Sequence, residues 1–419
     1  MSESAELVEH FFRHEYGRLV GLLTRSLGVR HLELVEDAVQ MAMWRGLHSW
    51  SRQGIPDRPA AWLYRTARNW VIDALRREAS LRKAQQSVSE TLCDEGYDSL
   101  PEDAAVEDES LRLLFLCCQP AIPSESQVAL ALKIVGGFSV SEIASGLLAS
   151  PASIEKRITR AKARLREEGE EIATLSIQAM QARLESVLLV LYLMFNEGFS
   201  ASQGESPLKR DVCDEAIRLT RMLIAQPLHG QPLLGQRPDV AAMLALMLMH
   251  SARFDTRVDA DQCVVLLADQ DRSAWDWSRV REAMHWMLVA ARGEQLSRYH
   301  IEVAIAWEHC RAATLEATDW QCVLGHYKLL MQVAPSAMVR LNAIIAESYA
   351  TGIDGALDSL RAMPAADRQQ LRPWWDCTMA NLLERQGEKA RARSHWRDAL
   401  ALAGSAANRK LIEKHLAAD

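Results

Sequence analysis

The chain has 419 residues and a formal net charge of -7, and its eight cysteines show no CxxC pair and no Cys/His ligand spacing. This length allows two or three domains, and the mild acidity excludes a protein that simply coats nucleic acid. The cysteine pattern is typical of a reduced, cytoplasmic protein. The N-terminus lacks a signal-peptide layout, and the longest apolar runs, 187–195 and 241–249, are too short to span a bilayer.

Residues 1–83 are predicted to form a small helical domain. Apolar residues at helical spacing predict the buried side of a first helix: Val35, Ala38, Val39, Ala42, Gly46, Leu47 and Trp50. A loop at 51–59 precedes a second helix at 60–78, whose apolar stripe is Leu63, Ala67, Trp70, Val71, Ala74 and Leu75. A different face of this helix carries Arg65, Asn69, Ile72 and Arg76, with Trp62 and Arg68 nearby. This mixture suits a nucleic-acid surface, whereas the alternative is an ordinary amphipathic helix with its arginines in water.

An acidic segment at 84–106 is predicted to be an exposed linker, since it has no Lys or Arg and no helical stripe. A second helical domain is expected at 107–172. Ser124 with Gln127 offers a capping box for one of its helices.

Residues 139–166 predict a helix-turn-helix. Ser139 with Glu142 has capping-box spacing, and Ser150 followed by Pro151 marks a second helix start. Ile154, Ile158, Ala161 and Leu165 form one buried stripe, and cationic residues lie on another face. Such a helix can enter a DNA major groove, whereas the alternative is a solvated basic helix.

The remaining chain is predicted to be all helical, as an extension at 173–300 and repeats at 301–419. Turns near Asp319, Gly352 and Gly387 are spaced by 352 - 319 = 33 and 387 - 352 = 35 residues. This spacing is close to the tetratricopeptide period, in which helix pairs stack into a solenoid. The fold class is therefore expected to be all-α.

These modules, in this order, resemble an extracytoplasmic-function-type sigma factor of bacterial RNA polymerase. The resemblance rests on LVEDAVQMAMWRGLHSW with AAWLYRTARNWVIDALRRE, followed by the helix-turn-helix. It implies two contact partners, core RNA polymerase (the β′ clamp and the β flap) and promoter DNA. The polymerase-binding residues implied on the exposed side of the first helix are Glu36, Asp37, Gln40 and Trp44.

The resemblance also implies two DNA-binding sets. The set for the -10 region is Arg52, Arg58, Trp62, Arg65, Arg68, Asn69 and Arg76. The set for the -35 region is Ser153, Lys156, Arg157, Arg160 and Arg164, with Lys156 and Arg157 expected nearest the bases. Trp70 is expected in the core.

Segments 191–202 and 252–277 resemble motifs of the subgroup with a fused C-terminal helical extension, although Gln262 stands where glycine is expected. The resemblance implies that the extension takes part in controlling activity. A regulatory protein is a further partner considered for the C-terminal repeats. No catalytic residue, metal or cofactor is expected. One alternative is a stand-alone helix-turn-helix regulator with a helical-repeat sensor. A second, an enzyme using His250, Asp255, Asp259, Asp261, Asp269, Asp271 and His285, has no ligand spacing to support it.

Overall fold

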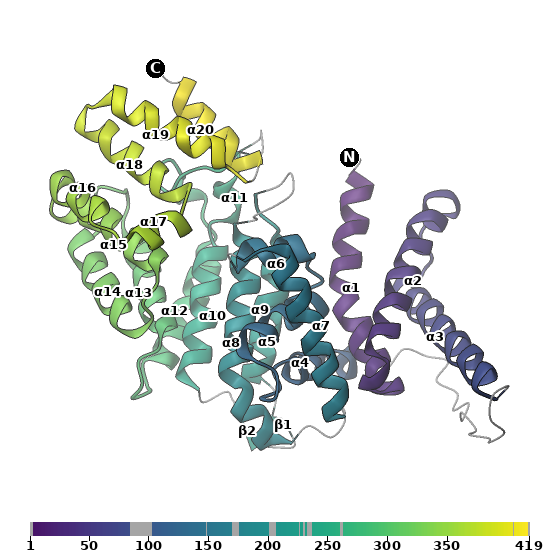
Figure 1. Ribbon diagram of the computed structural model, residues 1–419. Helices are drawn as coiled ribbons and strands as arrows, with labels where there is room; N and C mark the ends of the chain where they lie inside the picture. The colour runs from purple at the N-terminus through teal and green to yellow at the C-terminus, as the bar shows by residue number, and fades with distance from the viewer. Residues whose placement is uncertain are drawn as a thin grey trace. The chain divides into compact units, whose positions relative to one another are not determined.

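The computed structural model describes residues 3–83, 103–147, 149–169, 176–200, 207–225, 227–228, 231–232, 237–259, 263–404 and 406–417. The chain divides into two compact units, which we call the front unit (Met1–Val190) and the extension unit (Leu191–Asp419). Each unit is built from helices (Figure 1). The prediction of an all-α fold is confirmed, since the strands among the described residues are two of two residues each.

Short connections join most helices of the front unit. Its elements are α1 (Glu3–Leu27), the 3-10 turn η1 (Val29–His31), α2 (Leu32–Gln53), α3 (Pro59–Lys83), α4 (Asp103–Cys117), α5 (Ser124–Ile134), α6 (Val140–Gly146), α7 (Pro151–Glu168) and the start of α8 (Ile177–Phe199).

Helix α1 packs unusually close to the helices that follow α3. A Cβ atom on Gly17 would lie 2.4 Å from the carbonyl oxygen of Val135, just after α5, and one on Gly21 would lie 3.2 Å from the Glu109 carbonyl oxygen. Leu19 and Leu23 are fully buried. Two glycines one helical turn apart therefore let the backbone of α1 touch the second small helical domain.

The helix-turn-helix begins its helices where the sequence predicts. Ser139 and Glu142 form both hydrogen bonds of a capping box, and the Ser150 side chain caps α7 ahead of Pro151. The four residues of the predicted stripe on α7 are buried: Ile154, Ile158, Ala161 and Leu165.

Two local predictions in this region are wrong. Helix α5 starts without a capping box, because the Gln127 side chain donates instead to the carbonyl oxygens of Gln119 and Ile122. Residues 103–106 belong to α4 rather than to a linker. Acidic residues stabilise the N-terminus of a helix through its dipole, so the acidic composition of this segment is compatible with helix formation. The rest of the expected linker lies outside the described residues.

The extension unit continues α8 and adds shorter helices. Its elements are α9 (Arg210–Ala225), β1 (Pro227–Leu228), β2 (Gln231–Pro232), α10 (Pro238–Ser251), α11 (Phe254–Arg257), η3 (Arg272–Ala274), α12 (Trp277–Ala290), α13 (Arg298–Arg311), α14 (Trp320–Val333), α15 (Ala337–Ala350), α16 (Ile353–Arg361), α17 (Ala365–Gln370), α18 (Trp374–Gln386), α19 (Lys389–Leu402) and α20 (Ala406–Ala417).

The last part of the extension unit consists of helices joined by short turns. Asp319 caps α14, Gly352 precedes α16 with a φ of 118°, and Gly387 ends α18 with a φ of 91°. All three predicted helix boundaries are confirmed. Neighbouring pairs share cores, such as Leu341 and Ile344 of α15 against Leu357 of α16. No described helix is both long enough and apolar enough to cross a membrane.

Candidate nucleic-acid and polymerase interfaces

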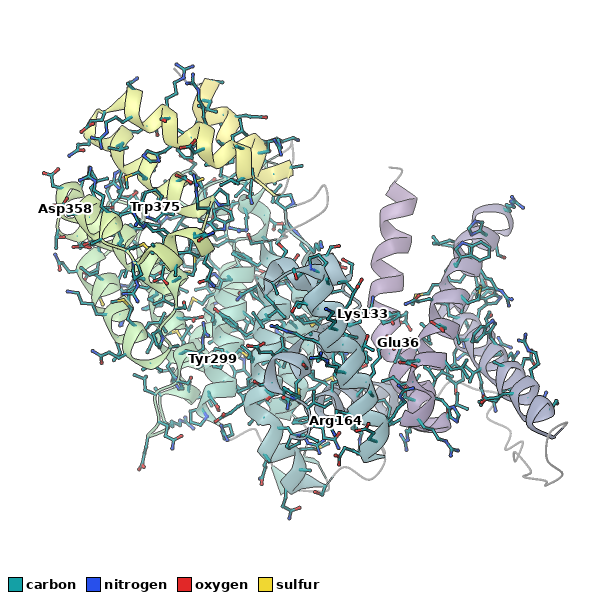
Figure 2. All side chains as sticks on the ribbon, in the orientation of Figure 1. Glu36, Lys133, Arg164, Tyr299, Asp358 and Trp375 are labelled. Carbon is teal, nitrogen blue, oxygen red and sulfur yellow. The ribbon has the colours of Figure 1, made fainter. Side chains whose placement is uncertain are left out.

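Helix α7 presents a basic face beside its buried stripe. Lys156 and Arg160 are exposed, and neither has an ion-pair partner among the described residues. Arg157 lies 2.8 Å from a carboxylate oxygen of Glu125 on α5, and Arg164, labelled in Figure 2, lies 3.2 Å from Glu167. Ser153 is half-buried, with its backbone N–H bonded to the Ser150 hydroxyl. Lys156 and Arg160 are thus the cations of this set that are immediately available to an anion.

Helix α3 presents the mixed face that the sequence predicts. Arg65, Asn69 and Arg76 are exposed, and Arg68 is half-buried. Arg52, in the last turn of α2, and Arg58, at the end of the loop that precedes α3, are also exposed. These residues occupy successive turns of one helix side and its approach, as a surface following a nucleic-acid strand requires.

Two tryptophans of α3, Trp62 and Trp70, are neither fully exposed nor fully buried. Trp62 is half-buried, with its ring edge-on to Trp50 at a centroid distance of 5.6 Å. Trp70, which was expected in the core, is half-buried as well. Trp62 therefore has a packed edge that fixes its ring while part of the side chain stays accessible.

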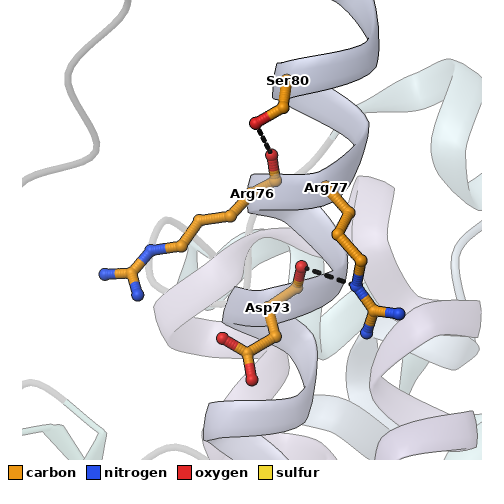
Figure 3. A pocket seen from close by; sticks show the side chains of 4 residues that line it. All are labelled: Asp73, Arg76, Arg77 and Ser80. Atoms are coloured by element: carbon orange, nitrogen blue, oxygen red, sulfur yellow. Dashed lines mark hydrogen bonds between the residues drawn. The ribbon is translucent and has the colours of Figure 1, made fainter.

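The far end of α3 carries a shallow, open pocket, lined by Asp73, Arg76, Arg77 and Ser80 (Figure 3). Arg77 donates from Nε to the Asp73 carbonyl oxygen at 3.2 Å, and Ser80 donates to the Arg76 carbonyl oxygen at 2.8 Å. The Arg76 guanidinium extends away from the other three side chains. It remains available for a phosphate.

On α2, three of the four expected polymerase-binding residues are accessible. Asp37 and Gln40 are exposed, and Trp44 is 56% exposed with its ring 4.2 Å from the His48 ring. Leu47, expected in the core, is 48% exposed and extends this surface. An acidic group, an amide and apolar side chains on one helix side form a surface that a protein partner would cover.

Glu36 is buried, so the prediction that it binds polymerase from the exposed side of α2 is wrong. It is only 3% exposed, accepts a hydrogen bond from the Tyr16 hydroxyl at 3.3 Å, and has its Oε2 2.6 Å from Lys162 Nζ on α7. The neighbouring carboxylate adds to the effect of burial and raises the pKa of Tyr16. By helix periodicity Glu36 (labelled in Figure 2) lies next to the surface residues of α2. It is buried because α7, which is distant in sequence, packs over it.

Further ion pairs join the two small helical domains of the front unit. Arg166 of α7 lies 3.2 Å from Glu33 of α2, and Arg25 of α1 contacts Glu109 of α4. Together with the Glu36–Lys162 pair and the close approach at Gly17, these contacts define what we call the closed interface. Sequence reasoning missed it, although the Gly17–Gly21 spacing was a visible signal of a close helix approach.

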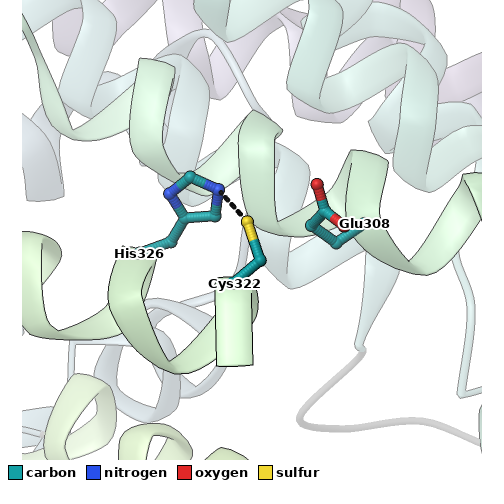
Figure 4. A group of neighbouring side chains, drawn as sticks. All are labelled: Glu308, Cys322 and His326. Atoms are coloured by element: carbon teal, nitrogen blue, oxygen red, sulfur yellow. Dashed lines mark hydrogen bonds between the residues drawn. The ribbon is translucent and has the colours of Figure 1, made fainter. Parts of the chain in front are cut away.

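Residues considered for an enzyme or metal site have other roles. Asp255 pairs with Arg210 at 2.6 Å, Asp271 accepts from the Ser273 backbone, and Asp261 lies outside the described residues. A separate group is formed by Glu308, Cys322 and His326 (Figure 4), but the Glu308 carboxylate already accepts from Arg311 Nε at 2.7 Å. A closed structural zinc site needs four ligands, so this group supports no metal assignment. The expected absence of a metal stays a prediction.

Comparisons with known proteins identify the front of the chain. Residues 11–81 match sigma-70 region 2, so the accessible faces of α2 and α3 lie on a sigma-factor domain. Residues 183–291 match a family of unknown function, DUF6596. A region 2 domain supports binding to core RNA polymerase and promoter DNA, roles that involve no catalytic chemistry.

An uncharacterized protein of Rhizobium meliloti (strain 1021), R00370, is 38% identical over 399 residues, covering 93% of this chain and 92% of that protein. The chain therefore belongs to the same family as that protein. No solved structure matches the chain.

Proposed function

We propose that this protein is an alternative sigma factor of the extracytoplasmic-function type. The observation that carries the proposal is one unit holding both a region 2 domain, with its exposed Arg/Asn face on α3, and a capped helix-turn-helix, with exposed Lys156 and Arg160 on α7. In this role α2 binds the β′ clamp, α3 reads the -10 region and α7 reads the -35 region. The second helical domain contacts the β flap, and the protein acts in the cytoplasm.

The closed interface must open for this function. Promoter elements centred near -10 and -35 are about 25 base pairs apart, or roughly 80 Å along B-DNA. Helix α7, at about 27 Å, is far too short to bridge that distance. The 2.6 Å contact between Lys162 and Glu36 cannot persist when both domains are on DNA. Polymerase and promoter therefore bind a form in which the two domains have separated.

Run-off transcription tests the assignment, using core RNA polymerase, the full-length protein and DNA from upstream of its own gene. Initiation is expected at a discrete start site and only with core polymerase. Asn69→Ala, which removes a base-contacting amide, is expected to lower promoter affinity roughly 5- to 150-fold, or about 1–3 kcal/mol. Arg160→Ala is expected to weaken binding to all sequences and to reduce the salt slope by about one.

Arg361→Ala serves as the charge-matched control, because Arg361 is exposed on α16 and pairs with Asp358 at 3.1 Å. It is expected to leave transcription unchanged. If neither core binding nor a transcript is seen, a stand-alone regulator replaces the sigma-factor proposal. If Asn69→Ala behaves like the control, the proposed role of α3 fails while the rest of the assignment stands.

The extension unit is proposed to control this activity, with its last helices acting as tetratricopeptide-like repeats that bind a regulatory protein. A chain ending after Val190 is the appropriate truncation, because Arg183 of α8 donates to the Phe115 carbonyl oxygen at 3.2 Å and belongs to the front unit. A rise in transcription from this truncated chain would indicate inhibition by the extension, and a fall would indicate that it is required. Unchanged transcription from a folded front unit would refute control.

A further inference from the structure

The described residues of two segments that sequence analysis singled out, 191–202 and 252–277, meet around one aromatic ring of the extension unit. Phe199 ends α8, and the Arg257 guanidinium stacks over its ring at 3.9 Å while donating to its carbonyl oxygen at 2.9 Å. The Arg253 guanidinium lies 5.5 Å from the centroid of the same ring and 5.9 Å from the centroid of the Trp275 ring. Promoter and polymerase binding give these residues no role.

Three arginines gather here, and Glu316 attracts one of them, Arg272, electrostatically. Among the described residues, no carboxylate lies within ion-pair distance of Arg253, Arg257 or Arg272. Arg272 donates to the carbonyl oxygens of His309 and Ala312, and its Nη2 is buried without a hydrogen-bond partner. Burial and the neighbouring cations lower the pKa of Arg253, and they lower the pKa of Arg257 to about 10. Both side chains remain cations at neutral pH, because a guanidinium is not deprotonated in proteins.

A cavity of about 350 Å³ lies against this cluster and is lined by side chains of α8, α10, α13, α14 and α15. Its polar lining includes Arg253, His250 and His309. The other two charged residues of the lining, Arg298 and Glu302, form an ion pair at 2.7 Å, so their charges offset each other. Much of the rest is apolar, including Ile305, Ala306, Leu330 and Val339. The volume is in the range of small-molecule sites.

The two histidines of the lining are neutral and supply polar nitrogen atoms beside the arginine charge. Arg253 donates from Nη2 to His250 at 3.2 Å, so His250 Nδ1 acts as an acceptor and the ring is neutral. Burial and the neighbouring arginines lower the pKa of His309 to about 4, and its Nδ1 is buried without a hydrogen-bond partner. His309 Nδ1 is therefore a nitrogen without a hydrogen-bond partner near the Arg253 guanidinium, which forms no ion pair with a described residue.

A partly buried charge without a counter-ion is costly, and proteins normally pair such groups. We propose that this cavity binds a small organic anion, with its acidic group on Arg253, His250 and His309 and its apolar body against Ile305, Ala306 and Val339. The lining favours one carboxylate, sulfonate or phosphate group on a hydrocarbon or aromatic body. This site is independent of the sigma-factor assignment.

The test uses 8-anilinonaphthalene-1-sulfonate, an apolar aromatic body with one anionic group, titrated calorimetrically into the full-length protein. One molecule is expected to bind per chain. Arg253→Met, which keeps an unbranched apolar side chain but removes the charge, is expected to weaken binding at least tenfold. It is also expected to leave the ligand-free melting temperature unchanged or higher, because an uncompensated charge is removed.

Matched variants separate a binding role from a structural one. Ala306→Phe fills the cavity and is expected to abolish binding even if Arg253→Met fails to fold. Arg221→Met changes an exposed arginine of α9 that pairs with Glu282 at 2.8 Å, and is expected to change nothing. If decanoate displaces the bound sulfonate probe and inorganic phosphate does not, the natural ligand is a carboxylate. If phosphate displaces the probe and decanoate does not, the ligand is a phosphate. Binding that is absent from the wild type, or unaffected by both cavity variants, overturns the proposal.

Discussion

Glu36→Lys is expected to lower the local stability of the front unit by about 3–5 kcal/mol, which is typical when one partner of a buried ion pair is lost. The new ammonium would face Lys162 where the carboxylate lies now, 2.6 Å from its Nζ, at side-chain exposures of 4% and 17%. Hydrogen–deuterium exchange of α2 and α7 in the full-length protein measures the effect. Amides of both helices are expected to exchange at least a hundredfold faster.

The double variant Glu36→Lys, Lys162→Glu restores an opposite-charge pair and is expected to return the exchange rates to within about tenfold of the wild type. Glu33→Lys is the matched control, because Glu33 also pairs with α7, at 3.2 Å from Arg166, but both side chains are about half exposed. An exposed pair contributes at most about 1 kcal/mol. Equal effects of the two single variants, or a double variant no better than Glu36→Lys, would show that the domains are not in contact in solution.

Features set by neighbouring residues could be predicted from the sequence. The capping box at Ser139, the Ser150 cap and the buried stripe of α7 depend on contacts within a few residues, so spacing alone reveals them. The exposed face of α3 follows from the same periodicity. Asp319, Gly352 and Gly387 mark helix boundaries for the same reason, because capping is a local property.

Burial created by distant segments could not be predicted. Glu36 shares a helix side with surface residues, and only the approach of Tyr16 and Lys162 covers it. Leu47 continues an apolar stripe, yet no described element of the front unit covers it and it stays exposed. The arginine cluster of the extension unit combines residues more than fifty positions apart, such as Phe199 and Arg257. In each case the deciding contact is absent from the local pattern.

Gly17→Ala and Gly325→Ala are the same substitution in two helices, and their effects are expected to have opposite signs. The new methyl group at Gly17 would lie 2.4 Å from the Val135 carbonyl oxygen, whereas nothing lies within 4 Å of a Cβ at Gly325. Overpacking against backbone is expected to destabilise the front unit by about 1–3 kcal/mol. Gly325→Ala is expected to stabilise α14 by up to about 1 kcal/mol through helix propensity. Hydrogen exchange of α1 and α14 measures both.

The same pair of variants connects stability to the proposed function. Promoter binding requires the closed interface to open. If the closed interface is destabilised by about 1–3 kcal/mol, the population of the open form rises roughly 5- to 150-fold, provided that this population is small. Gly17→Ala is therefore expected to bind core polymerase and promoter DNA more tightly than the wild type, and Gly325→Ala to bind equally well. Faster exchange of α1 without tighter binding would show that the closed interface stabilises the fold but does not oppose promoter binding. Unchanged exchange would place α1 away from Val135 in solution.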